Sequence, residues 1–522
     1  MKRHLLTALA LAALGLCAGP LAPAHAQDAQ RPMLRVSSGA ADNKTFDPDR
    51  ATTTNDLGVV SELFNALVRF PPGSSDPSKL EPDLAQSWDV SNNGKVWTFH
   101  LRKGVQFHGG YGELTAADVV YSLKRAADPS RSSFASNFSD VDNIEALDNY
   151  TVRVTLKYPD ARFLGRVSNY HGGYIISEKA AEKLGTQFGA TPIGTGPFAF
   201  SKHVTQQYVE LLANDKYYLG KPRLAGIIYR MIPSDSAREL AFDSGELDLV
   251  YGKREHRWVE RARKRGYNVD IFDPAEFRIL HLNRRIKPLD NLKVRQAIAA
   301  AVDVDQIMKY VGKDVGAKGC SVVPDGYLGH DCSAGAYVHD VAKAKKLLAE
   351  AGYPKGIELK SIVSNISAQL PIMEIIQAQL AEAGIKLDME VVDHATYQAR
   401  SRKDQSAIVF YGAARFPNAD AYLSEFFDSA AQIGSPTAMS NFSHCSVADA
   451  DIRAARIESD PAKQLALWKD AQRKIHDDVC GVPLFGLKQV WVHSSKVHYG
   501  YDLQGAMNLA PPVTEKTTLD SK

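Results

Sequence analysis

The sequence predicts an α/β protein built as two lobes. With 522 residues, 44% hydrophobic and 23% charged, the chain has the composition of a globular protein and is too long for one core. Residues 277–308 carry a strand pattern followed by a helix pattern, with similar lengths of ordered sequence on either side. Residues 340–392 alternate helix and strand patterns as a βαβ unit does. We therefore place a crossing between two α/β lobes at 277–308.

The central stretch, Phe277 to Met308, begins as a strand and continues as a helix. Its strand is carried by Ile279, Leu280 and Leu282, and Pro288 marks the join. Asn291 is a suitable N-cap for the helix. That helix would turn these apolar residues inward: Leu292, Val294, Ile298, Ala301 and Val302.

The βαβ pattern indicates where a ligand would bind. Its elements are a helix from 340 to 352, a strand at 357–363, a helix from 370 to 384 and a strand at 385–392. Gly352 and Gly384 suit the left-handed position that ends a helix. A right-handed crossover makes the strands parallel, and ligands contact the loops at their carboxyl ends. Ser364 and Asn365 in the first loop are therefore candidate ligand-binding residues, and the second loop begins at Asp393.

The first strand of the chain is predicted at Leu34 to Ser37. The loop after it, residues 39–55, is rich in Asp, Asn and Thr, and its Thr53 and Thr54 are candidate ligand contacts. A plain solvated connection is the alternative. A helix follows, with a predicted inner face of Val59, Leu63, Leu67 and Val68.

The N-terminus has the pattern of a secretory signal peptide, residues 1–26. Lys2 and Arg3 precede an apolar run, and small residues before Gln27 form a cleavage site. A membrane anchor is the weaker alternative, because the run is shorter than the ~20 residues that a span needs. Lipid attachment at Cys17 is a minor alternative. We expect export to the periplasm.

The charge balance argues against nucleic acid or an anionic membrane surface as the main partner. Loss of Lys2 and Arg3 with the signal peptide would lower the 62 basic residues to match the 60 acidic ones. The basic run Lys253–Arg265 has two interpretations. It is either an anion-binding segment or, as we favour, a solvated helix face with Trp258, Val259 and Ala262 buried.

Four of the five cysteines remain after the signal peptide. Cys320 and Cys332 bracket a loop with proline and glycines that a disulfide can close, and Cys445 with Cys480 follows by elimination. A zinc site built from the four is the alternative, but none of their spacings is CxxC. The chain also has no GxSxG, HExxH or Walker-type motif. We expect no cofactor, and nothing in the sequence argues for nickel or haem.

Residues 84–129 combine a hairpin with a capped helix. The turn Asn92-Asn93-Gly94 joins two alternating strands, and Thr115 with Asp118 forms a capping box. This segment resembles the signature region of ABC-transporter solute-binding proteins for dipeptides, oligopeptides and nickel. The resemblance continues in the same order through four further blocks, which begin at Gly194, Asn214, Leu289 and Ala344.

The resemblance implies the rest of the architecture and the function. It implies a two-lobed periplasmic binding protein of the Venus-flytrap type, with two interlobe crossings, the return crossing lying near Val482 to Leu487. Lobe 1 would span 27–279 with an inserted subdomain at about 70–190, lobe 2 would span 280–487, and 488–522 would return to lobe 1. Such a protein captures a small ligand, here expected to be peptide-like or anionic, in the cleft between its lobes and hands it to a membrane ABC permease, and we expect a monomer. An extracytoplasmic hydrolase of peptides or esters is the alternative, although no nucleophile, base and orienting group are recognisable together.

The resemblance also points to further ligand-binding residues. Peptide-binding relatives carry a tryptophan and an aspartate in a loop that matches residues 410–427 here. The tryptophan position falls near Gly412, and Arg415 stands at the aspartate position. Tyr411, directly before Gly412, and Arg415 are the candidate ligand-binding residues of this segment.

Residues 357–372 contain no arginine for a peptide carboxylate, so we expect an anionic ligand facing Arg415. The alternative is that Arg415 is shifted in the alignment or points to solvent. Phe134 and Phe138 match positions that line the cleft in relatives, although either could be core.

Overall fold

The computed structural model describes residues 31–160, 163–434, 440–458 and 460–520. Residues from Pro32 onward form one compact unit. The predicted signal peptide, 1–26, with Cys17 lies outside the described residues, as does Gln27. Among the described helices, none is both long and apolar enough to cross a membrane.

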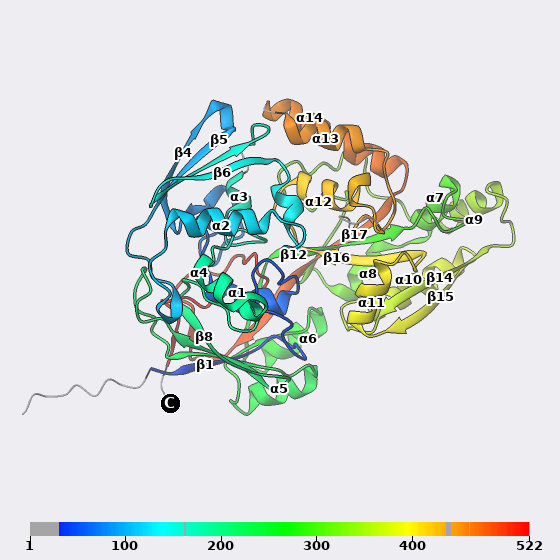
Figure 1. Ribbon diagram of the computed structural model, residues 1–522. Coiled ribbons are helices and arrows are strands. Elements are labelled where there is room, and N and C mark those ends of the chain that lie inside the picture. Colours follow the sequence, from blue (N-terminus) through cyan, green and yellow to red (C-terminus); the bar gives the residue numbers. More distant parts are fainter. Residues whose placement is uncertain (1–30, 161–162, 435–439, 459, 521–522) are drawn as a thin grey trace, which may run out of the picture. The chain divides into compact units, whose positions relative to one another are not determined.

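A nine-stranded mixed sheet runs through the described chain (Figure 1). In spatial order its strands are β16 (Ile408–Ala413), β12 (Asn268–Leu282), β17 (Gly481–His493), β11 (Leu249–Tyr251), β1 (Met33–Ser37), β10 (Gly226–Arg230), β9 (Tyr208–Ala213) and β8 (Phe198–Val204), with β13 (Gly316–Lys318) beside β17. The first predicted strand is confirmed as β1.

β12 and β17 are the two crossings. The first half of β12 pairs with the second half of β17 beside β11 and β1, in the first lobe. The second half of β12 lies between β16 and the first half of β17, in the second lobe. The register shifts between Phe272 and Glu276, which interrupts the ladder between the two halves. Two crossings were expected, and the two antiparallel strands show how they are built.

The inserted part of lobe 1 has its own sheet and core. Its sheet is ordered β4 (Ala85–Ser91), β5 (Val96–Leu101), β7 (Thr151–Leu156) and β6 (Val141–Asp148). The predicted hairpin is β4–β5, and the predicted capping box opens α2 (Ala116–Ala126). Trp97, Phe99 and Leu123 pack in its core. The bounds of this subdomain and of the lobes stay predictions.

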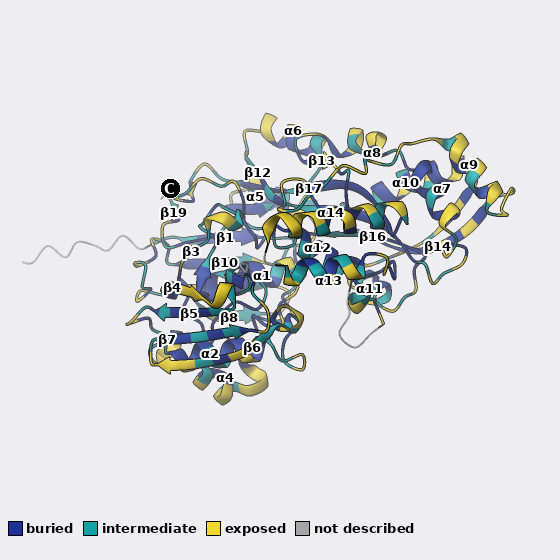
Figure 2. Ribbon diagram, turned by 90° about the horizontal axis from the view of Figure 1, so that it is seen from above, coloured by how far each residue is buried: buried dark blue, intermediate teal, exposed yellow. Residues whose placement is uncertain are grey.

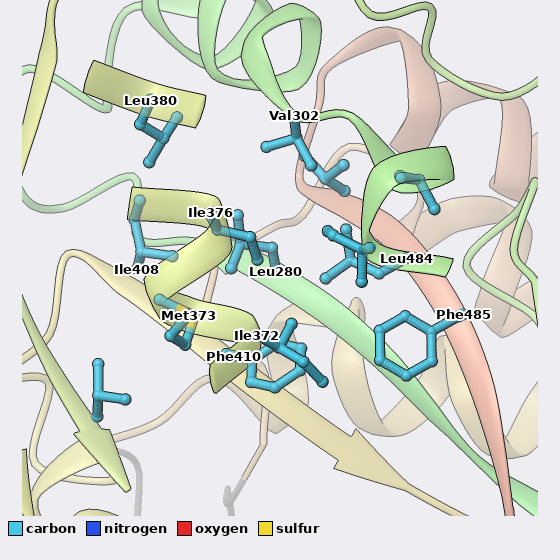
Figure 3. Close-up of a cluster of buried hydrophobic side chains, with 14 of the residues drawn as sticks. Leu280, Val302, Ile372, Met373, Ile376, Leu380, Ile408, Phe410, Leu484 and Phe485 are labelled. Atoms are coloured by element: carbon cyan, nitrogen blue, oxygen red, sulfur yellow. The ribbon is translucent and has the colours of Figure 1, made fainter. Parts of the chain in front are cut away.

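The predicted βαβ unit is confirmed in lobe 2. β14 (Ile357–Ser364) and β15 (Ile385–Val392) are parallel and are joined by α10 (Leu370–Glu382). Gly352 and Gly384 have φ of +92° and +85°, the left-handed conformation expected of helix ends. Figure 3 shows α10 residues Ile372, Met373 and Ile376 beside Leu280 of β12 and Phe410 of β16. The crossing strand therefore forms part of the lobe 2 core.

Helices cover the sheets. Those not yet given are α1 (Thr54–Leu63), α3 (Phe163–Arg166), α4 (Glu178–Leu184), α5 (Asp235–Asp243), α6 (His256–Lys264), α7 (Leu292–Ala301), α8 (Val304–Val311), α9 (Val341–Glu350), α11 (His394–Ser401), α12 (Ala419–Phe426), α13 (Asp449–Ile457) and α14 (Pro461–Asp477). Two-stranded pairs β2 (Val68–Arg69) with β3 (Glu81–Pro82) and β18 (Val497–His498) with β19 (Thr518–Leu519) complete the fold. Figure 2 shows exposed outer faces on α6 and α9.

Two helix ends differ from the sequence prediction. α1 ends at Leu63 because Phe64 is extended, so Leu67 lies beyond the helix and Val68 lies in β2, although both are buried. Apolar spacing continues past the helix because the following segment also enters the core. The helix capped by Asn291 ends at Ala301, and Val302 is its extended C-cap.

Candidate functional site

Charged side chains gather where the two crossing strands change register. Glu276 and Arg278 follow the register shift on β12 and, two residues apart, point to the same face of the strand. Arg254, between β11 and α6, reaches the same place from lobe 1. We call Arg254, Glu276 and Arg278 the crossing triad.

Glu276 receives both guanidinium groups on one oxygen. Arg278 Nη2 donates to Glu276 Oε2 at 2.6 Å, and Arg254 Nη1 lies 3.0 Å from that oxygen. The side chains of Arg278 and Arg254 are only 3% and 8% exposed. Within the described chain, Arg278 Nε makes no hydrogen bond, and no second carboxylate pairs with either guanidinium. The triad therefore carries one surplus positive charge away from bulk water.

Arg278 fits inside the sheet because Gly412 stands opposite to it. The two residues are Cα partners in the β12–β16 ladder. A Cβ added at Gly412 would lie 2.2 Å from Arg278 Nη1 and 2.4 Å from its Cζ, closer than real atoms approach. The guanidinium also lies 5.8 Å from the ring centroid of Phe410. Glycine at 412 leaves the space that the guanidinium occupies.

The predicted residue Ser364 contacts His394, whose imidazole feels the charge of Arg278 in the triad. Ser364 is fully buried, and its Oγ lies 3.0 Å from His394 Nδ1. Burial lowers the pKa of His394, and the charge of Arg278 lowers it further, so the imidazole is neutral at pH 7. Burial raises the pKa of Glu276, but the charges of Arg254 and Arg278 outweigh it and hold that pKa below its usual value. His394 therefore adds no charge to the triad, and Glu276 stays ionised.

Arg415 belongs to a second group, which joins the inserted part of lobe 1 to the segment between β16 and α12. Arg415 Nη2 donates to Glu425 Oε1 at 2.5 Å, its Nε donates to the other carboxylate oxygen, and its Nη1 donates to Ala414 O at 2.9 Å. Tyr170, from lobe 1, donates to Ala414 O at 3.3 Å. We call Tyr170, His171, Arg415 and Glu425 the lobe-contact group.

An aromatic stack extends this group on the lobe 1 side. The ring centroids of His171 and Tyr170 are 3.7 Å apart, and those of His171 and the predicted Phe134 are 4.7 Å apart. Burial lowers the pKa of His171 well below its usual value, and Arg415 adds to the shift. The histidine is therefore a neutral aromatic ring in this stack at physiological pH.

The other predicted residues lie outside these groups, although Phe138 packs beside Gly172, the residue after His171. Thr53 caps α1, its Oγ1 accepting the Asp56 N–H at 3.2 Å, and Thr54 is exposed. Phe138 is buried in the core of the inserted part. Asn365 is exposed and donates its backbone N–H to Val392 O.

Tyr411 lies on β16 next to Gly412. Its ring packs against Phe442 with 4.9 Å between centroids, and Arg402 Nη2 donates to its hydroxyl at 3.4 Å. Tyr411 is therefore beside the strand position that faces Arg278.

Sequence reasoning missed Arg254, Glu276, Arg278 and Glu425. The prediction that Lys253–Arg265 is a solvated face is confirmed for α6, where Trp258, Val259 and Ala262 are buried. It is wrong for Arg254, whose side chain is turned inward to Glu276. A usable signal was present at Glu276 and Arg278, since two charged residues at alternate positions of a buried strand need partners.

The disulfide predictions are confirmed. Cys320 is bonded to Cys332 and Cys445 to Cys480, with Cα–Cα distances of 5.6 and 5.7 Å. Among the residues that the structure describes, Cys320, His330 and Cys332 bring potential metal ligand atoms within 4.8 Å of one another. Because the two sulfur atoms are bonded to each other, the thiolates that zinc needs are not available there.

Solved structures similar to this chain are binding proteins. The PBP/SBP MoaA from A. tumefaciens R10, in complex with mannopinic acid, is 44% identical, with a TM-score of 0.91 over 94% of this chain and 100% of MoaA. The ABC transporter-associated periplasmic binding protein DppA from Helicobacter pylori, in complex with peptide STSA, is 31% identical, with a TM-score of 0.83 over 94% of this chain and 98% of DppA.

Curated sequences give the same picture. Heme-binding protein A of Haemophilus influenzae is 30% identical over 81% of each chain. The family model "Bacterial extracellular solute-binding proteins, family 5 Middle" matches residues 79–433, well over half of the chain. The two-lobed fold with two crossings, the family match and the relatives agree with one another. This chain is therefore an ABC-transporter solute-binding protein that belongs to the bacterial extracellular solute-binding proteins of family 5.

Proposed function

We propose that this protein binds a small organic acid between its lobes in the periplasm, as a monomer, and delivers it to an ABC permease. The observation that carries the proposal is the full-length similarity to MoaA, whose structure holds mannopinic acid. DppA, whose structure holds a peptide, is the less similar of the two. Export by the leader at 1–26 is part of the proposal.

The lobe-contact group supports capture by closure. Tyr170 of lobe 1 bonds to the backbone of lobe 2, and the ring of Phe416 lies 6.0 Å from that of Phe70. A ligand that contacts both lobes stabilises the conformation in which such contacts form, since it binds that conformation better than the open one.

Glu425 changes what Arg415 offers to a ligand. Arg415 was expected to face an anionic ligand, but Glu425 neutralises the guanidinium. Glu425 is also the one carboxylate of this group, and Arg415 already uses both of its oxygens. A peptide ammonium buried there would find no unpaired carboxylate, and removing an ammonium from water costs several kcal/mol when it is unpaired. Arg415 keeps two N–H groups outside these bonds, and we propose that they reach the ligand.

The hydrolase alternative rests on Ser364 and His394, a hydroxyl and an imidazole in contact. The amide nitrogen of Gln398 lies 3.3 Å from His394 Nε2, and an amide nitrogen is a donor. His394 Nε2 then accepts, so Nδ1 carries the proton and donates to Ser364 Oγ. A histidine that donates to a serine does not act as its base. We infer that this protein binds its ligand without turning it over.

Calorimetric titration tests the proposal. The pure protein should bind mannopinic acid and should show no heat of binding with unmodified dipeptides or tripeptides. Tight binding of free peptides without binding of the acid would overturn the ligand class. Release of product from a labelled peptide or ester would overturn the assignment as a non-enzyme.

A further inference from the structure

The crossing triad has a charge that the protein itself does not balance. Two guanidinium groups share one carboxylate oxygen, and both are more than nine-tenths buried by side chain. A guanidinium stays protonated in proteins, so the surplus charge is not relieved by loss of a proton. His394, the neighbouring base, is neutral. An isolated buried charge is costly, and proteins therefore pair such charges.

The N–H groups of the triad are also incompletely used. Arg278 Nε makes no hydrogen bond among the described residues, and the only carboxylate that Arg254 Nη1 contacts there is the one it shares with Arg278. Gly412, opposite Arg278, has no side chain, so the guanidinium of Arg278 fits into the space beside it. The N–H groups of a guanidinium lie in one plane and can donate to both oxygens of a carboxylate at once.

The two arginines of the triad come from parts of the main sheet in different lobes. Arg254 follows β11 in the lobe 1 part of the main sheet, whereas Arg278 is paired with β16 in lobe 2. Glu276 lies directly after the register shift between the two halves of β12. An anion held by both arginines would therefore contact residues from both sides of the crossing.

We propose that Arg254 and Arg278 form the subsite for a carboxylate of the bound solute, and that Glu276 holds the two arginines in place while no solute is bound. This inference rests on the proposed function and assigns the acidic group of the ligand to the triad rather than to Arg415. The bound carboxylate balances the surplus charge, and Glu276 competes with it for the same donors.

Calorimetry with mannopinic acid on three variants tests the subsite. Arg278→Gln and Arg254→Gln should each weaken binding at least tenfold, because each removes the surplus charge. Glu276→Gln should tighten binding several-fold, because it removes the competing carboxylate. If Glu276 were merely structural, its loss would weaken binding as the arginine substitutions do. Equal affinity in the wild type and both arginine variants, or weaker binding by Glu276→Gln, would overturn the subsite.

Two controls separate this inference from the proposed function. Arg153→Gln removes an exposed positive charge in the inserted part, paired with Glu145 at 3.6 Å, and should leave binding unchanged. Acetate serves as a second probe if the wild type does not bind mannopinic acid. At equal ionic strength, acetate should raise the melting temperature of the wild type more than chloride does, and this difference should vanish in Arg278→Gln. A difference that persists in Arg278→Gln, or no difference in the wild type, would overturn the subsite whatever the true solute is.

Discussion

Two buried charge clusters in this protein have opposite composition. In lobe 1, Arg125 pairs with two carboxylates. Its Nη1 donates to Asp47 Oδ1 at 2.9 Å and its Nη2 to Asp47 Oδ2 at 2.5 Å, and it also pairs with Asp49. In the crossing triad, one carboxylate, Glu276, serves two guanidinium groups. Among buried side chains, the first cluster has a surplus acid and the second a surplus base; the exposed Arg50 also lies 4.0 Å from Asp47 Oδ2.

The difference matters because a surplus negative charge on a carboxylate can be neutralised by binding a proton, whereas the surplus positive charge on an arginine cannot be lost in this way. Burial, with the neighbouring charge of Asp47, raises the pKa of Asp49 to about 7, although Arg125 opposes the shift. The lobe 1 cluster can therefore become neutral by protonation near physiological pH. Arginine has no such option, so the crossing triad needs an external anion. Both clusters contain an unpaired guanidinium Nε, so net charge rather than an unpaired N–H distinguishes them.

The largest effect should come from removing the central arginine of the lobe 1 cluster. Arg125→Gln leaves two buried aspartates without their cation, and breaking a buried pair in this way costs about 3–5 kcal/mol of unfolding free energy. Arg278→Gln in the ligand-free protein should cost at most about 1 kcal/mol, because a balanced Arg254–Glu276 pair remains. Urea unfolding monitored by tryptophan fluorescence would compare them, and equal losses would mean that the charge balance of the two clusters is not what separates them.

A smaller effect is expected in the pH dependence of stability. The pKa of Asp49 is higher in the folded protein than in the unfolded chain, so its contribution is complete below about pH 4 and is lost as pH rises towards about 7. Asp49→Asn should abolish this loss, which we place at about 2 kcal/mol after allowing for coupling to Arg125 and Asp47. Unfolding free energies of wild type and variant between pH 4.5 and 7.5 would measure it; parallel curves would contradict the assignment.

The smallest effect should follow from filling the space beside Arg278. A methyl group at Gly412 would overlap the guanidinium, so Gly412→Ala should displace it and weaken binding of mannopinic acid about tenfold, equal to about 1.4 kcal/mol. Gly58→Ala is the matched control for loss of a glycine, because nothing lies within 4 Å of its Cβ position and, like Gly412, it has no positive φ. Unchanged affinity in Gly412→Ala would argue against a role of Arg278 in binding.

Local patterns determined the elements of this protein. The spacing of apolar residues and the two glycine stops predicted the βαβ unit of β14, α10 and β15, and the capping box predicted the start of α2. The proline and glycines between Cys320 and Cys332 predicted a closable loop. Each of these features depends on residues that are near in sequence, so the sequence was sufficient for them.

Tertiary structure alone decided what the charged residues do. Arg415 was predicted as a ligand-facing cation, but its partner Glu425 lies on the next helix, and only the turn between β16 and α12 brings them together. The partnership of Arg278 with Gly412 depends on the register of β12 against β16, across more than a hundred residues. Arg254 is one residue of a solvated basic segment until the fold places it against Glu276. The sequence by itself determines which charges exist and how strands and helices form locally. The fold decides which charge stands opposite which, because ion pairing depends on distances of a few ångströms between segments that are remote in the chain.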